Sequence, residues 1–86
     1  QNYPNPFNQS TEISFSIPAR SHVEITIYNL LGQLVREVID QAYRSGDHRV
    51  RWDGRDHANT PVSSGVYLVR MTTDAGAFTK KMILLR

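Results

Sequence analysis

The sequence contains no cysteine among its 86 residues. Neither a disulfide nor a thiolate metal site is therefore available, and the core has to hold by packing alone. The sequence also lacks long hydrophobic runs. The apolar run near the end, Met82–Leu85, is far shorter than the roughly 18 residues of a membrane-spanning helix. We therefore expect no transmembrane segment and no cysteine-based cofactor site.

An excess of charge of one sign is also missing. Ten Lys and Arg stand against eight Asp and Glu, which gives a formal net charge of +2. Four arginines fall between positions 44 and 55, but Asp47 and Asp53 are interleaved with them. This pattern indicates a mixed-charge surface and not the basic stripe of nucleic-acid-binding proteins. We expect no nucleic-acid partner.

The length predicts one domain, residues 1–86. The chain begins with Gln1 and shows neither the basic nor the apolar region of a signal peptide. The missing initiator Met suggests a fragment excised from a larger protein.

What the sequence does have is hydrophobic alternation with period two, the pattern of half-buried strands. It is clear in Glu12–Ile17, which Pro18 ends because proline removes a ladder donor, and again in Val23–Tyr28. The segment Leu34–Asp40 fits both a helix face and a strand, but its β-branched residues favour a strand. Gly32, in the connection before it, is expected to supply a positive φ.

The second half of the chain continues the pattern. His48–Trp52 alternates, and a long loop follows up to Gly65. Two further strands, Val66–Thr73 and Phe78–Leu85, form a predicted C-terminal hairpin. Because Met82–Leu85 loses the alternation, we expect a central strand covered on both faces.

These segments amount to six strands, or seven if Tyr3–Phe7 is included, and they recur about every 8–12 residues with turns between them. No convincing helix is predicted. The spacing is typical of an all-β antiparallel sandwich of two sheets. The aromatic residues expected at the centre of its core are Phe15, Trp52, Tyr67 and Phe78.

Catalysis has little support in the sequence. Ser63 and Ser64 precede a glycine in a loop, where serine is an ordinary turn residue, and no nucleophile-elbow motif surrounds them. Glu12, Glu24 and Glu37 lie on different predicted strands, with no reason to converge as an acid–base pair. We expect no catalytic residue.

Metal binding is also poorly supported. The histidines His22, His48 and His57 lack the spacing that points two imidazoles at one ion. Three oxygen-bearing residues, Asp53, Asp56 and Asn59, share one loop, which suits either a calcium ion or turns that bond their own backbone. The turn interpretation is favoured, and the calcium question stays open.

A carbohydrate-binding module is an alternative from another functional class. β-Sandwiches can present exposed aromatic side chains, and Tyr28, Tyr43 and Tyr67 could stack on sugars. Since fold alone does not determine function, a purely structural spacer is a further alternative.

Several motifs in a fixed order resemble one family. They are Asn2-Tyr3-Pro4-Asn5-Pro6-Phe7-Asn8, Tyr28-Asn29-Leu30-Leu31-Gly32-Gln33-Leu34-Val35, Trp52-Asp53-Gly54-Arg55-Asp56, Ser64-Gly65-Val66-Tyr67 and the ending Lys80-Lys81-Met82-Ile83-Leu84-Leu85-Arg86. Together they resemble the C-terminal sorting domain (type A) of type IX secretion. They are also similar to the Ig-like domain of flagellar hook-capping proteins.

The resemblance implies a seven-stranded Ig-like sandwich that directs a larger secreted protein, often a hydrolase or adhesin, through the bacterial outer membrane. The sorting domain itself would not be an enzyme and would need no cofactor. Its partners would be the secretion machinery and the upstream domain of its parent. We expect a monomer on a secreted or surface-attached protein.

The resemblance also assigns roles to residues. Those expected to act in recognition are Gly65, Tyr67, Lys80, Lys81 and Arg86. Those expected to shape the fold are Pro4, Pro6, Phe7, Gly32, Trp52, Asp53 and Gly54. Asn59 stands where the family often has glycine, and asparagine is the next-best residue for a left-handed conformation.

Overall fold

Six antiparallel strands in two sheets form the domain, in a computed structural model that describes residues 10–85. The smaller sheet pairs β1 (Thr11–Ile17) with β4 (Gly46–Trp52). The larger sheet has the order β3-β2-β5-β6. Its strands are β2 (Ser21–Tyr28), β3 (Leu34–Tyr43), β5 (Gly65–Thr73) and β6 (Gly76–Leu84).

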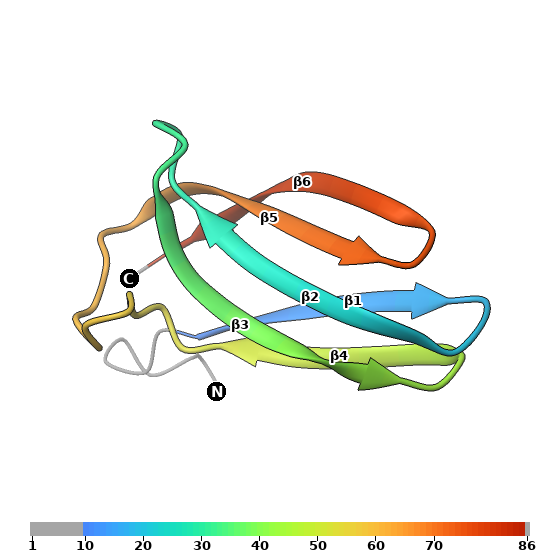
Figure 1. The fold of residues 1–86 in the computed structure, drawn as a ribbon. Helices are drawn as coiled ribbons and strands as arrows, with labels where there is room; N and C mark the ends of the chain where they lie inside the picture. Colours follow the sequence, from blue (N-terminus) through green and yellow to red (C-terminus); the bar gives the residue numbers. More distant parts are fainter. Residues whose placement is uncertain (1–9, 86) are drawn as a thin grey trace.

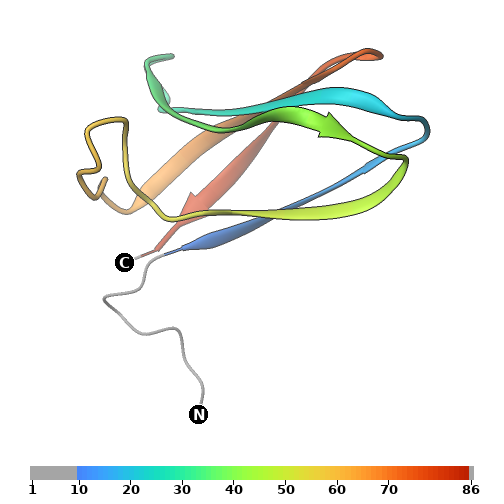
Figure 2. The ribbon, with the colours of Figure 1, turned by 60° about the horizontal axis from the view of Figure 1, so that its bottom comes forward.

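The two sheets lie one above the other as the layers of a sandwich (Figures 1 and 2). The chain passes between the layers after β1, after β3 and after β4, so each layer combines strands from distant parts of the sequence. The β5–β6 hairpin and the strand at Leu34–Asp40 confirm two of the sequence predictions. The all-β sandwich class is confirmed as well.

Alternating side chains fill the space between the layers. In β1 and β2 every second residue is buried, because successive side chains of a strand point to opposite faces. The central residues are Val23, Ile25 and Ile27 of β2, which are fully buried. Trp52 closes one end of this core with 1% of its surface exposed.

Two expectations about the C-terminal hairpin are wrong. Phe78 is 53% exposed, since it lies on the edge strand β6 with no strand beyond it among the described residues. Met82–Leu85 is not covered on both faces either: Leu84 is 2% exposed, but Ile83 is 64% and Leu85 74% exposed. The run therefore alternates in burial like any half-covered strand, although its residue types do not.

Six strands are described, and the seventh predicted strand, Tyr3–Phe7, lies outside the described residues, as do Pro4, Pro6 and Arg86. Gly32 has the predicted positive φ, 83°, at the turn between β2 and β3. Asn59 has a φ of 65° and is the one non-glycine residue with positive φ among residues 10–85. The left-handed interpretation of Asn59 is therefore confirmed.

Candidate functional site

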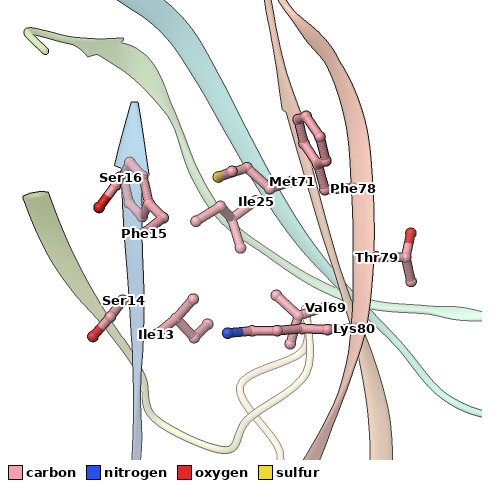
Figure 3. A pocket seen from close by; sticks show the side chains of 10 residues that line it. All are labelled: Ile13, Ser14, Phe15, Ser16, Ile25, Val69, Met71, Phe78, Thr79 and Lys80. Atoms are coloured by element: carbon pink, nitrogen blue, oxygen red, sulfur yellow. The ribbon is translucent and has the colours of Figure 1, made fainter. Parts of the chain in front are cut away.

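The expected recognition lysines lie on β6 but on opposite sides of the sheet. Lys80 pairs with Val69, whose side chain is in the core, so Lys80 is on the inner side. Figure 3 shows its side chain reaching across from β6 toward Ile13 of β1. Lys81 pairs with Leu68 and is on the outer face of the sheet. One flat partner surface therefore meets Lys81 or Lys80, but not both.

An apolar groove of about 210 Å³ opens on the inner side, between the edge strands β1 and β6 (Figure 3). Its apolar walls are Ile13, Phe15, Ile25, Val69, Met71 and Phe78. Lys80 contributes the cation at its rim. The sandwich is therefore open along this side, while the crossing from β3 to β4 joins the two layers elsewhere.

Gly65 and Tyr67, the other expected recognition residues, lie on β5 directly beside β6. Gly65 is opposite Leu84 and Tyr67 is opposite Met82. Tyr67 is 7% exposed, and its hydroxyl donates a hydrogen bond of 2.6 Å to the carbonyl oxygen of Ser63. Tyr67 would therefore influence a partner only indirectly, through the position of β5, because the ring itself is inaccessible.

The motif at the end of β4 forms a closed corner. The indole nitrogen of Trp52 donates to the carbonyl oxygen of Arg55 at 3.0 Å, and the ring meets Tyr67 edge-on with centroids 5.4 Å apart. Asp53 Oδ1 accepts the backbone N–H of Arg55 at 3.1 Å. Gly54, with a φ of 74°, provides the turn between them. These residues fix the corner from which the long loop departs.

The second carboxylate of this loop, that of Asp56, also bonds to nearby backbone. Asp56 Oδ1 accepts backbone N–H groups from Ala58 and Thr60, each at 3.0 Å. This is the local self-bonding typical of aspartate in turns. The turn interpretation accounts for the carboxylates of Asp53 and Asp56 without a calcium ion.

Three acidic residues converge elsewhere, on the outer face. Carboxylate oxygens of Glu24, Glu37 and Asp40 lie within 4.8 Å of one another. The expectation that Glu24 and Glu37 have no reason to converge is therefore wrong, because β2 and β3 are neighbours in the sheet. All three side chains are exposed, and Asp40 contacts the imidazole of His22. An exposed cluster of this kind has no enclosed space in which to exclude water from a reaction.

The remaining candidates have structural roles. The Nε2 atom of His48 lies 2.7 Å from the carbonyl oxygen of Arg44, and its ring packs beside Phe15 and Tyr43. Tyr43 is engaged edge-on by Phe15 as well, with centroids 5.2 Å apart. Since Tyr67 is buried, Tyr28 is the one proposed sugar-stacking residue on the outer face, and a single half-buried ring makes a poor platform.

The comparison that decides the family concerns the whole chain. The sequence profile described as "Secretion system C-terminal sorting domain" matches residues 1–85. The chain belongs to this family of sorting domains. The family consists of type IX sorting domains, which are non-catalytic. Such a domain marks a secreted or cell-surface protein that interacts with secretion machinery.

Solved structures show where else this fold occurs. FlgD from P. aeruginosa has a TM-score of 0.71 and 23% identity, over 91% of this chain and 60% of that protein. FlgD from Xanthomonas campestris, described with hook capping in flagellar assembly, has a TM-score of 0.63 and 20% identity, over 91% of this chain and 57% of that protein. At such identities the likeness establishes the fold alone.

Two further comparisons are negative. No curated protein matches the sequence of this sorting domain. Within residues 10–85, no helix is long and apolar enough to cross a membrane.

Proposed function

We propose that this sorting domain directs a larger secreted parent, such as a hydrolase or adhesin, across the bacterial outer membrane to the cell surface, and that the machinery recognises it as a folded surface. Membership of the sorting-domain family carries the first part of the proposal. The arrangement of β6 supports the second part. Leu84 is enclosed in the core, so a receptor that reads this strand meets Ile83, Leu85 and the lysines on its surface.

The residues proposed to act in recognition divide into two kinds. Lys80, Lys81 and Arg86 belong to the C-terminal segment and would contact the machinery directly. Gly65 and Tyr67 would act by holding β5 against β6, and their pairing with Leu84 and Met82 supports this role. The domain itself contributes no chemistry to this process, only a shape and a set of charges.

A fusion experiment tests the proposal. Residues 1–86 are attached to a reporter enzyme in a host with type IX machinery, and exported activity is measured. We expect export with the intact domain and its loss when Lys80–Arg86 is deleted. Unchanged export after the deletion would refute a role for this segment.

A second pair of variants separates a folded signal from a linear one. Leu84→Asp places a charge in the core and should abolish both folding and export. Lys80→Ala combined with Lys81→Ala should leave folding intact, because both side chains are exposed. Export that continues with an unfolded Leu84→Asp domain would show that the machinery reads a linear tag.

A further inference from the structure

The β2–β3 hairpin ends in two exposed leucines. Leu30 is 63% and Leu31 84% exposed, the latter more than any other large hydrophobic residue described. We call these two residues the leucine tip. Both views show the loop that carries them extending beyond the larger sheet, on the side away from β1 and β4 (Figures 1 and 2). Leaving two adjacent leucines in water has no benefit for the fold of the isolated domain.

The loop that presents the leucine tip is held in place by Asn29. The side-chain oxygen of Asn29 accepts the backbone N–H groups of Leu31 and Gln33, each at 3.0 Å. Its amide group donates to the Gln33 side chain at 2.8 Å, and its backbone bonds both Gln33 and Gly32. A loop ordered in this way loses little conformational freedom when it docks, which favours binding.

The leucine tip continues into an apolar row across the outer face of the larger sheet. Cross-strand neighbours share a face, and the pairs Leu34–Tyr28, Tyr28–Leu68 and Val66–Ile83 follow one another from β3 to β6. We call the five residues the outer apolar band: Leu34, Tyr28, Leu68, Val66 and Ile83. Leu34 is 49% and Ile83 64% exposed, and the other three are half-buried.

Two cations border the outer apolar band. Lys81 is opposite Leu68, and Arg70 is the next outward-facing residue of β5. Both are exposed, and within residues 10–85 neither forms a salt bridge. An apolar strip beside unpaired cations is complementary to an apolar surface that carries carboxylates at its border.

We propose that the leucine tip and the outer apolar band together form the docking face for a protein of the secretion machinery, which offers an apolar groove for the leucines and carboxylates opposite Lys81 and Arg70. The inference rests on the sorting function proposed above and names the surface that is read. On this face Lys81 is the lysine that the partner meets, whereas Lys80, on the inner side of the sheet, would be reached only from the side of the groove.

A protein fits this face better than a lipid bilayer does. The leucine tip has no basic residue in its loop, Asn29 to Gln33, to meet anionic headgroups. The same face also carries the acidic cluster of Glu24, Glu37 and Asp40, which such headgroups would repel. A protein groove can accept the leucines and leave the acidic end of the face in water.

Reporter export separates this inference from the sorting function. The fusion carrying residues 1–86 is compared with Leu30→Ser plus Leu31→Ser, with Lys81→Glu, and with the control Gln41→Ser plus Ala42→Ser on exposed β3. Folding of each purified domain is checked by thermal melting. Burial of one leucine is worth about tenfold or more in affinity, so export should fall about tenfold or more in the double variant Leu30→Ser plus Leu31→Ser, the leucine-pair variant. It should fall with Lys81→Glu and stay unchanged with the control.

Each outcome of the export assay has one meaning. No export by the unaltered domain would refute the sorting function. Normal export by that domain together with normal export by a folded leucine-pair variant would refute the docking face and leave sorting intact. Because the reporter replaces the parent, a loss of export in the leucine-pair variant does not arise from lost contact with the parent's own surface.

The class of partner is tested directly. A benzophenone side chain at position 31 should yield, on irradiation, an adduct with a protein in cells that contain the machinery and none in cells that lack it. An equal adduct in both strains would refute the proposal. Co-sedimentation with phosphatidylglycerol vesicles that is lost in the double variant Leu30→Ser plus Leu31→Ser would also refute it. So would a concentration-dependent dimer, seen by light scattering, that dissociates in this double variant.

Discussion

At the scale of single residues, Tyr67 joins the core to the loop before β5. Its ring is buried, and its hydroxyl donates to the Ser63 carbonyl oxygen. Tyr67→Phe removes this hydrogen bond and leaves the carbonyl without its donor, so the free energy of unfolding should fall by about 0.5–1.5 kcal/mol. Urea denaturation measures the loss.

The matched control for this variant is Tyr43→Phe. Tyr43 is half-buried, but among the described residues its hydroxyl has no hydrogen-bond partner. Its removal should therefore change the unfolding free energy by less than about 0.5 kcal/mol. Equal losses in the two variants would show that the bond to Ser63 does not stabilise the fold.

Asn59 offers a second test at this scale, because its φ of 65° is costly for most residues. Asn59→Ala should destabilise the domain by about 1 kcal/mol, whereas Asn59→Gly should be close to neutral. Thermal unfolding distinguishes them, since about 1 kcal/mol shifts the midpoint by roughly 4–8 °C in a domain of this size. If alanine were tolerated as well as glycine, the left-handed conformation would not limit stability at this position.

Residue-scale predictions from the sequence succeeded where local chemistry decides the conformation. The positive φ of Gly32 and Asn59 follows from which residues tolerate that conformation, and both are observed. The turn role of Asp53 and Asp56 follows from the tendency of short carboxylates to bond nearby N–H groups. The acidic cluster was missed, because its members meet through the pairing of β2 with β3, which residue types alone do not specify.

At the scale of elements, β6 shows why the hydrophobic pattern misled. Met82–Leu85 is uninterrupted and apolar, and such a run is typical of a strand buried on both faces. In the structure β6 is an edge strand with one face in the core and Ile83 on the outer face. An apolar residue on the exposed face breaks the alternation of residue types in the same way as a buried one. The pattern alone does not distinguish these cases.

Adjacent positions in β6 should therefore differ sharply in their effect on stability. Leu84→Ala opens a cavity in the core and should lower the unfolding free energy by roughly 2–5 kcal/mol. Ile83→Ala removes a mostly exposed side chain and should change it by about 0.5 kcal/mol or less. Chemical denaturation of both variants provides the measurement. A large loss for Ile83→Ala would mean that its face is covered in the domain itself.

At the scale of the whole molecule, the sandwich class and the six strands within residues 10–85 could be predicted because period-two alternation and turn spacing are local signals. The pairing order was not predicted. Which strands become edges depends on contacts between segments far apart in the sequence, such as β1 with β4 and β2 with β5. As a consequence, the groove between β1 and β6, and the placement of Lys80 in it, emerged only from the structure.

The groove between β1 and β6 leads to a last prediction, which concerns self-association of the domain. The edges of β1 and β6 border the groove, and free strand edges invite pairing with other chains unless charged residues obstruct it. Lys80 reaches into this space, so Lys80→Val should remove the obstruction and add apolar surface where two domains can meet. We expect Lys80→Val to form dimers or larger species at concentrations where the unaltered domain is monomeric.

Lys81→Val is the matched control, because it removes the same charge from the same strand on the outer face. Light scattering over a series of protein concentrations, with residues 1–86 as the reference, gives the masses. Association by Lys80→Val alone would show that the inward lysine protects the open side of the sandwich. Association by both variants to the same extent would assign the effect to net charge, since the two differ only in the face they alter. Monomers in both cases would show that the edges are protected without Lys80.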